Sequence, residues 1–278
     1  MSDGVRLDLR LVKDGLASGR EKAKELIVGG QVTVNGKTVT KPSSSVLPTD
    51  SVVSLQGAPR FVGRGGYKLD KALERYFPSL EGMTVADIGA STGGFTQCML
   101  QRGAVRVYAI DVGRDQLHET LRQDPRVVCM EQTDIRDREK IGKQIAADSL
   151  DFAATDVSFI SLRAVVPEIC RLLKDGAYFV CLIKPQFEAG RKALNKHGIV
   201  RDPADHRRVI AELLLYFTAN HLQTQYLDFS PVRGGDGNIE YLAVTRYLPR
   251  QEIAFFPEAQ IDMTVDTAVR ELTNKNGR

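Results

Sequence analysis

The feature that most constrains this fold is a short apolar run that stops at a cluster of glycines. Residues 84–88 have the composition of a buried strand, residues 95–100 have helical spacing, and the glycines between them stand at positions 89, 93 and 94. Glycine permits a positive φ and leaves room for a ligand to approach the main chain. The sequence therefore predicts a strand, a glycine turn that faces a ligand, and a helix.

An acidic residue ends the next predicted strand, at 105–111. In a doubly wound sheet, Asp111 would lie beside the glycine turn, where its carboxylate can accept hydrogen bonds from a ribose. The turn lacks the G-x-G-x-x-G spacing of a dinucleotide site, and Asp87 just before it would oppose a pyrophosphate. The same acid suits the cationic amino-acid end of S-adenosylmethionine. We therefore predict S-adenosylmethionine as the cofactor, with NAD, or a turn that binds nothing, as the alternatives.

After the turn, apolar runs alternate with stretches of helical spacing. Helices are predicted at 162–173 and 203–221, and further strands at 127–130, 151–159, 177–185, 225–229 and 240–245. Such alternation is typical of a parallel sheet with helices on both faces. We therefore predict an α/β fold for residues 67–278, a Rossmann-like seven-stranded domain of the class I methyltransferase type.

Residues 1–58 have a different pattern and predict a small α+β domain with two helices and a hairpin. Ser18 and Glu21 have the spacing of a capping box at the start of a helix over 20–27. Asn35-Gly36 lies between two short apolar runs, which is the pattern of a tight hairpin. A linker is predicted at 59–66.

Charge is distributed unevenly along the 278 residues. Residues 1–72 carry a net charge of +5 and the remainder −2, so a polyanion would bind the first quarter of the chain. The four cysteines are widely spaced and predict buried thiols in a reducing compartment, with no disulfide or metal site. The sequence starts without a signal-peptide pattern and has no run long enough to span a bilayer, so we predict a cytoplasmic protein.

Four charged residues fall where ligands bind an open α/β sheet, beyond the carboxyl ends of its strands. They are Lys68 before the first strand, Asp156 late in the fourth, Lys184 at the end of the fifth and Glu240 at the start of the seventh. Glu240 reaches this edge only if the seventh strand is antiparallel. Lys184 is the most informative, because a lysine that ends a wholly apolar strand is costly unless it is paired.

Several long motifs, in a fixed order, make the chain resemble a known family. The first 55 residues, with R-L-D-x-x-L, G-L-A-S-G-R-E-K-A-K-E-L-I and V-x-V-N-G, are similar to the S4 RNA-binding domain. The remainder resembles the FtsJ-type 2′-O-methyltransferases in G-R-G-G-x-K-L, D-I-G-A-S-T-G-G-F-T, T-D-V-S-F-I-S-L, I-K-P-Q-F-E-A-G and G-x-x-G-N-x-E-Y. Together these parts resemble the TlyA family of S4-containing rRNA 2′-O-methyltransferases, which are also labelled haemolysins.

The resemblance implies methylation of a ribose 2′-hydroxyl, in cytidine of 16S rRNA, 23S rRNA or both. The methyl donor would be S-adenosylmethionine and the partners ribosomal RNA or ribosomal subunits, without a metal or a membrane. Lys68, Asp156, Lys184 and Glu240 would form the catalytic tetrad. In it, Lys184 serves as the base if it is neutral when it acts, Asp156 orients Lys184, and Glu240 positions Lys68 and the ribose.

Two further sets of residues complete the prediction. The cofactor-binding set is Asp87, Gly89, Ala90, Ser91, Gly93, Gly94, Phe95, Asp111, Val112, Asp134, Ile135 and Asp156. The RNA-binding set is Arg6, Lys13, Arg20, Lys24, Arg60, Arg64, Phe187, Arg191 and Lys192. Two other classes of function stay open: a non-catalytic RNA-binding or ribosome-assembly protein, against which the intact tetrad argues, and a membrane-lytic protein, which no strongly amphipathic basic helix supports.

Overall fold

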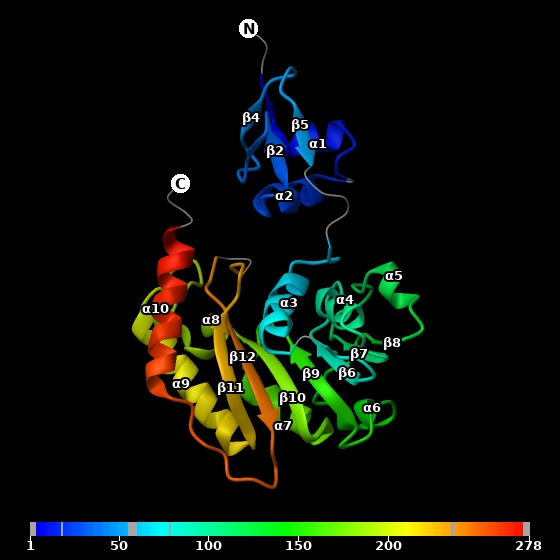
Figure 1. The fold of residues 1–278 in the computed structure, drawn as a ribbon, viewed down its shortest axis with the longest axis vertical. Coiled ribbons are helices and arrows are strands. Elements are labelled where there is room, and N and C mark those ends of the chain that lie inside the picture. Colours follow the sequence, from blue (N-terminus) through cyan, green and yellow to red (C-terminus); the bar gives the residue numbers. More distant parts are fainter. Residues whose placement is uncertain (1–3, 18, 55–59, 78, 235–236, 275–278) are drawn as a thin grey trace. The chain divides into compact units, whose positions relative to one another are not determined.

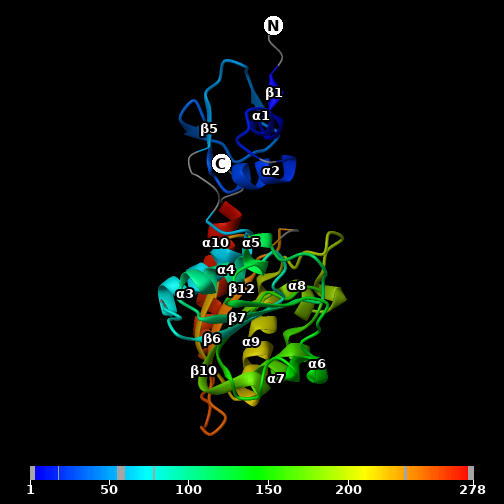
Figure 2. The same cartoon turned by 90° about the vertical axis from the view of Figure 1, so that its right-hand side faces the viewer.

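The computed structural model divides the chain into two units, residues 1–60 and residues 61–278. It describes residues 4–17, 19–54, 60–77, 79–234 and 237–274. Figures 1 and 2 show the helices and strands of each unit in two views. The two-unit organisation separates the basic N-terminal part of the sequence from the part that contains the glycine turn.

The first unit is a small α+β fold built around a few apolar side chains. Leu7, Leu11 and Ile27 are fully buried in its core. Asn35 and Gly36 have φ angles of 51° and 78°, as the tight hairpin turn requires. Its elements are β1 (Val5–Arg6), α1 (Leu7–Lys13), α2 (Arg20–Val28), β2 (Val32–Val34), β3 (Lys37–Thr38), β4 (Ser45–Val46) and β5 (Val52–Ser54).

The short strands of this unit form two small sheets. Helix α2 starts at Arg20, as the sequence predicted. The sheet order is β3-β2-β5, and β1 pairs with β4. Helix α2 begins directly after Gly19, which has an extended backbone. Ser18, the predicted capping residue, lies outside the described residues. The two helices and the hairpin confirm the predicted α+β pattern.

The second unit is built on a seven-stranded sheet, which confirms the predicted α/β fold. Its order is β11-β12-β10-β9-β6-β7-β8, with β9 in the centre. Strand β12 runs antiparallel to both of its neighbours, and the pairs among β6 to β10 are parallel. The strands are β6 (Thr84–Ile88), β7 (Arg106–Ile110), β8 (Val127–Met130), β9 (Leu150–Thr155), β10 (Leu173–Ile183), β11 (Leu222–Phe229) and β12 (Tyr241–Tyr247).

Helices cover both faces of this sheet (Figure 1). Side chains of α7, α9 and α10 pack on one face, and side chains of α3 and α4 pack on the other. The helices are α3 (Gly65–Tyr76), α4 (Gly94–Gln101), α5 (Glu119–Arg122), α6 (Arg138–Gly142), α7 (Leu162–Leu172), α8 (Pro185–Glu188), the 3₁₀ helix η1 (Arg191–Ala193), α9 (Pro203–Ala219) and α10 (Glu258–Asn274).

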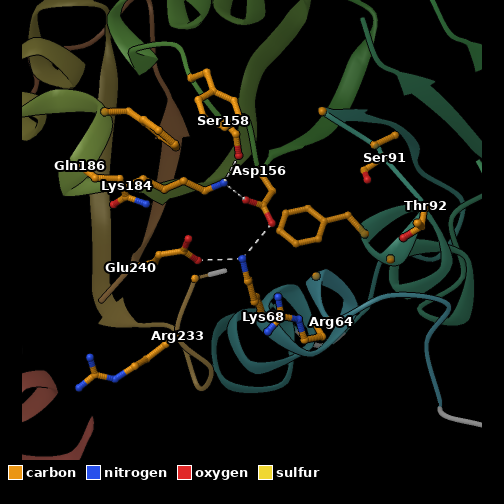
Figure 3. A pocket seen from close by; sticks show the side chains of 18 residues that line it. Arg64, Lys68, Ser91, Thr92, Asp156, Ser158, Lys184, Gln186, Arg233 and Glu240 are labelled. Atoms are coloured by element: carbon orange, nitrogen blue, oxygen red, sulfur yellow. Dashed lines mark hydrogen bonds and ion pairs between the residues drawn. The ribbon is translucent and has the colours of Figure 1, made fainter. Parts of the chain in front are cut away.

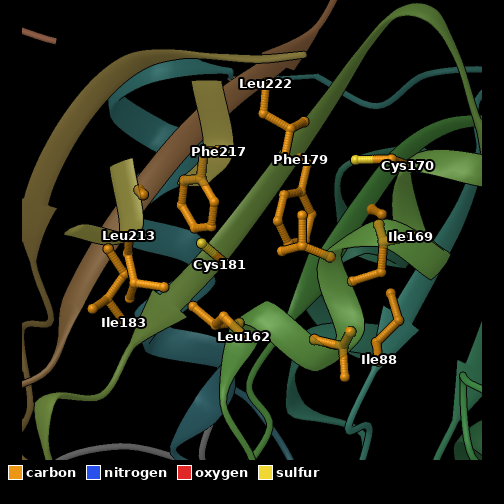
Figure 4. Packing of buried hydrophobic residues seen from close by; sticks show 14 of the residues in the cluster. Ile88, Leu162, Ile169, Cys170, Phe179, Cys181, Ile183, Leu213, Phe217 and Leu222 are labelled. Atoms are coloured by element: carbon orange, nitrogen blue, oxygen red, sulfur yellow. The ribbon is translucent and has the colours of Figure 1, made fainter. Parts of the chain in front are cut away.

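Strand β10 shows why the central strands are continuously apolar. Phe179, Cys181 and Ile183 point into the core under α7 and α9, as Figure 4 shows, whereas Val180 and Leu182 belong to the core on the opposite face. Because successive side chains of a strand alternate in direction, a strand covered on both faces needs apolar residues at every position. Burial of Cys98, Cys170 and Cys181 confirms their prediction as core thiols, while Cys129 is half-buried.

Part of the predicted linker belongs to the second unit. Phe61 is only 1% exposed and lies in the core beneath α3. A Cβ at Gly66 would lie 2.3 Å from Phe61 Cγ, so the start of α3 packs directly on this ring. Residues 55–59 lie outside the described residues.

Candidate active site

A cavity of about 390 Å³ opens at the carboxyl edge of the central strands, in the size range of small-molecule sites. It lies within the second unit, and Figure 3 shows its side chains. The glycine turn forms one side, and the residues that follow β9 and β10 and precede β12 form the other. The cavity is lined by Arg64, Gly65, Lys68, Gly89, Ala90, Ser91, Thr92, Gly94, Phe95, Asp156, Ser158, Phe159, Lys184, Gln186, Phe187, Arg233, Gly234 and Glu240.

The four charged residues singled out in the sequence form one continuous chain of contacts in this cavity. Lys68 Nζ donates to Glu240 Oε2 at 2.8 Å and to Asp156 Oδ2 at 3.1 Å. Lys184 Nζ lies 2.6 Å from Asp156 Oδ1 and donates to Ser158 Oγ at 2.8 Å. Two cations and two anions are therefore balanced in a largely dehydrated site, as buried charges require.

Each of these residues is placed by a different element. Lys68 lies in the first turn of α3, Asp156 follows β9 and Lys184 follows β10. Glu240 precedes β12, whose antiparallel direction brings its first residue to the same edge. The sequence indicated that Glu240 reaches this edge only if the seventh strand is antiparallel, and β12 is antiparallel to both of its neighbours.

Interactions among the buried charges fix the protonation states of Lys68 and Asp156. Burial alone lowers the pKa of Lys68, but the charges of Asp156 and Glu240 outweigh burial and raise it. Burial also acts to raise the pKa of Asp156, but Lys68 and Lys184 outweigh that effect and lower it. Lys68 is consequently held as an ammonium ion and Asp156 as a carboxylate.

The glycines of the turn meet requirements of backbone conformation and packing within the chain. Gly89 and Gly93 have φ of 83° and 94°, which L side chains rarely adopt. A Cβ at Gly93 would lie 2.3 Å from Leu121 Cδ1, and one at Gly94 would lie 2.7 Å from the backbone nitrogen of Gly66. Gly93 and Gly94 thus let the turn fit against α5 and α3. Gly89 and Gly94 also line the cavity, and the close approach of a ligand to the turn stays a prediction.

Asp87 is fully buried just before the turn. Its Oδ2 accepts hydrogen bonds from the backbone N–H and the hydroxyl of Thr96, at 2.8 and 2.7 Å. Its Oδ1 has no hydrogen-bond partner among the described residues. Burial raises the pKa of Asp87 to about 7. A buried carboxylate oxygen without a donor is costly and suits a site that a ligand's donor completes.

Half of the cofactor candidates do not line the cavity, namely Asp87, Gly93, Asp111, Val112, Asp134 and Ile135. Asp111 Oδ2 accepts from the Ser91 N–H at 2.8 Å, so this acid stands beside the glycine turn as predicted. Val112 is 72% exposed, and Asp134 forms an ion pair with Arg136 at 2.6 Å. Ile135 is buried in the core instead.

The predicted RNA-binding residues divide between the two units. In the first unit, Arg6 and Arg20 both contact the buried Asp8, at 2.9 and 3.1 Å, and the hydrogen bond from Arg6 holds the pKa of Asp8 well below its usual range. Both guanidinium groups are thereby fixed but remain about half exposed. Lys24 pairs with Glu21, and Lys13 and Arg60 are exposed.

In the second unit, two of the RNA-binding candidates belong to the cavity. Arg64 and Phe187 line it, whereas Arg191 and Lys192 lie on the exposed helix η1 outside the lining set.

Sequence reasoning missed several lining residues, of which Phe159 is the most unusual. Its side chain is 90% exposed, its φ is +65°, and its ring lies 5.2 Å from that of Phe187. A bulky residue in this backbone region is strained, and such strain concentrates at functional sites. Its position in T-D-V-S-F-I-S-L was the available signal. Thr92, Ser158, Gln186 and Arg233 were also missed.

Comparison with known proteins agrees with this geometry. The model of the FtsJ-like methyltransferase family matches residues 61–247, and the S4 domain model matches residues 5–52. The chain belongs to the FtsJ-like methyltransferase family. The family match covers more than half of the chain and contains every residue of the cavity.

Similar proteins extend over nearly the whole length. YqxC of Bacillus subtilis, described as a candidate rRNA methyltransferase, is 44% identical over 97% of this chain and 96% of its own. The 16S/23S rRNA (cytidine-2′-O)-methyltransferase TlyA of Mycobacterium tuberculosis is 38% identical over 87% of this chain and 89% of its own. A solved structure of a candidate hemolysin from Streptococcus thermophilus is 38% identical, covers 100% of both chains and superposes with a TM-score of 0.76. These relatives confirm the resemblance to the TlyA family.

Two features are absent from the residues that the structure describes. No helix among them is long and apolar enough to cross a membrane. Nor do the described ranges contain a group of three or more His, Cys, Asp or Glu residues that could hold a metal ion.

Proposed function

We propose that this protein transfers a methyl group from S-adenosylmethionine to the 2′-oxygen of a ribose, in cytidine of 16S rRNA, 23S rRNA or both. The observation that carries the proposal is the buried chain Glu240–Lys68–Asp156–Lys184, which faces the glycine turn across one cavity. The TlyA relative is named for this reaction, and the S4 match supplies an RNA-binding module.

Lys184 is the residue that we assign as the base. A 2′-hydroxyl is a weak nucleophile and has to lose its proton as the new bond to carbon forms. Two carboxylates hold the charge of Lys68, whereas Lys184 contacts one carboxylate and one hydroxyl. We therefore assign Lys184, whose amine has the fewer carboxylate partners, to accept the hydroxyl proton when its amine is neutral.

The other three charged residues hold Lys184 and the ribose in place. Asp156 contacts both lysines, so its carboxylate orients the Lys184 amine. Glu240 fixes Lys68, whose ammonium can donate a hydrogen bond to the ribose. Such positioning makes a reaction of two substrates effectively unimolecular and supplies much of the rate enhancement.

The residues around the glycine turn suit the proposed cofactor. The backbone of 89–91 lines the cavity, and Asp111 beside it can accept hydrogen bonds from a ribose. Asp87 precedes the turn, and its Oδ1 has no donor among the described residues. This oxygen would accept a hydrogen bond from the ammonium group at the amino-acid end of the cofactor. The chemistry that S-adenosylmethionine supplies there is an electrophilic methyl group.

The RNA would be recognised by both units. Exposed basic residues of the S4 domain would contact phosphates, and the exposed ring of Phe159 together with the half-buried ring of Phe187 at the cavity would stack on a base. Arg64 at the cavity would hold a phosphate near the target ribose.

The decisive experiment measures transfer of a labelled methyl group to ribosomal subunits purified from cells that lack the protein. Wild type is compared with Lys184→Ala and with Lys174→Ala. Lys174 lies near the other end of β10, is half exposed and does not line the cavity, so it is the matched control. Loss of a general base lowers the rate about 100-fold or more.

We expect label on a ribose 2′-oxygen with wild type and Lys174→Ala, and almost none with Lys184→Ala. Equal activity of the two variants would refute the assignment of Lys184. An absence of label on either subunit, together with measurable cofactor and RNA binding, would instead favour a non-catalytic assembly protein.

A further inference from the structure

The buried carboxylate of Glu188 links two segments that line the cavity, the one after β9 and the one after β10. The proposed mechanism gives Glu188 no role. Glu188 ends helix α8, four residues after Lys184, and its side chain is 2% exposed. Its Oε2 accepts a hydrogen bond from Ser161 Oγ at 2.7 Å, and its Oε1 accepts one from the backbone N–H of Leu162 at 2.7 Å.

These contacts make Glu188, at the end of α8, a capping residue for the start of helix α7. The first N–H groups of a helix have no partner within the helix, and negative charge is favourable beside them. Ser161 Oγ accepts from the backbone N–H of Arg163 at 3.1 Å while it donates to Glu188. Burial raises the pKa of Glu188, and the hydrogen bonds from Ser161 and Leu162 oppose this effect. The carboxylate thus satisfies α7 and stays buried.

The cap fixes the distance between the segment 156–161 and the segment 184–188. The contacts of Lys184 with Asp156 Oδ1, at 2.6 Å, and with Ser158 Oγ, at 2.8 Å, cross between the same two segments. Helix α8 has only four residues and cannot hold its own position. Without Glu188, the segment after Lys184 would lose its direct hydrogen bonds to α7.

We infer that Glu188 is a positioning residue, which holds the Lys184 amine against Asp156 and Ser158 by fastening α8 to α7. The inference rests on the proposed function for its catalytic consequence. Because small displacements of a reacting group are costly, loss of the cap lowers turnover. Cofactor binding and RNA binding through the S4 domain are retained, since the S4 domain and the glycine turn make no part of this contact.

The first test compares kcat and KM for Glu188→Ala, Glu188→Gln and Ser161→Ala. We expect kcat to fall about tenfold in Glu188→Ala, with KM for the RNA within about twofold. Glu188→Gln keeps one acceptor oxygen and should be intermediate. Adding Ser161→Ala to Glu188→Ala should lower kcat by a smaller factor than Ser161→Ala does in the wild type, because the hydrogen bond between Ser161 and Glu188 is already lost.

Glu168→Gln is the matched control. Glu168 is also a largely buried carboxylate at α7, but it pairs with Arg138 and Arg171 and does not line the cavity. Its loss should leave kcat unchanged. If Glu188→Ala does not fold, the intermediate value expected of Glu188→Gln carries the test.

The second test does not depend on methyl transfer. The Lys184 amine is 8% exposed and ion-paired, so acetic anhydride should label it slowly in the ligand-free protein. We expect Glu188→Gln and Glu188→Ala to accelerate this labelling several-fold relative to Lys174, as measured by mass spectrometry, and Glu168→Gln to leave it unchanged.

The two tests separate the two proposals. Faster labelling of Lys184 in a protein whose wild type transfers no methyl group would refute the proposed function and support the positioning role. An active wild type, with kcat and labelling in the Glu188 variants equal to those of Glu168→Gln, would refute the positioning role alone.

Discussion

Replacement of Asp87 by asparagine tests whether the buried acid before the glycine turn destabilises the ligand-free fold. Asp87 is 0% exposed, and only its Oδ2 has hydrogen-bond donors among the described residues. Burial raises its pKa from 3.8 to about 7, with the hydrogen bonds of Thr96 acting in the opposite direction. Asparagine has nearly the same shape, keeps an acceptor for Thr96 and does not ionise.

The sign of the effect follows from the raised pKa. The folded state binds a proton at Asp87 more tightly than the unfolded state does, so its contribution to stability is fully present below about pH 4 and is lost as the pH rises through about 7. A shift of roughly 3 pKa units corresponds to about 4 kcal/mol in all. About 2.5 kcal/mol of that loss falls between pH 5 and pH 8.

Urea unfolding at several pH values measures this difference. The chain has no tryptophan, so circular dichroism is the suitable signal. We expect the free energy of unfolding of the wild type to fall by about 2.5 kcal/mol relative to Asp87→Asn between pH 5 and pH 8. The comparison with the variant cancels all other titrating groups. We also expect the variant to bind S-adenosylmethionine more weakly at pH 8. Parallel stability profiles would refute the reasoning.

Three further predictions concern other parts of the molecule. Phe179→Ala should lower the free energy of unfolding by about 3–5 kcal/mol in urea titrations, because the ring is fully buried between the sheet and its helices. Arg20→Ala should weaken RNA binding and reduce the slope of log affinity against log salt by about 1 if it contacts a phosphate, and an unchanged slope would exclude that contact. At Glu131, burial opposes ionisation, but hydrogen bonds from Leu117 and Arg122 outweigh burial and lower the pKa to about 2. The wild type should therefore lose amide protection in this loop as the pH falls from about 4.5 towards 2, whereas Glu131→Gln should show no such dependence.

The positions of most strands could be predicted because their signals are local. Strand β6 covers residues 84–88 and β8 covers 127–130, as the apolar runs indicated. Strand β10 begins at Leu173, four residues before its predicted start. Its early residues Lys174 and Asp175 are exposed and lie in an irregular stretch of the pairing with β9, so the hydrophobic pattern could not reveal that the strand extends over them.

Residue types alone also indicated the charged part of the site. Lys184 follows a wholly apolar strand, and a lysine there needs partners, which the structure supplies as Asp156 and Ser158. Phe159 and Gln186 were not indicated, because an aromatic or amide residue in a loop is ordinary until its exposure and backbone angles are known. The burial of Glu188 against Ser161 was equally invisible, since the two residues stand 27 positions apart.

The sequence by itself determined which residues form strands, where the glycine turn lies and which charged groups need partners, since these properties depend on near neighbours in the chain. Tertiary structure alone decided that β12 is antiparallel and brings Glu240 to Lys68, that Asp87 Oδ1 is left without a donor among the described residues, and that Glu188 caps α7. Strand direction and hydrogen-bond partners depend on contacts between segments far apart in sequence, and no local period encodes them.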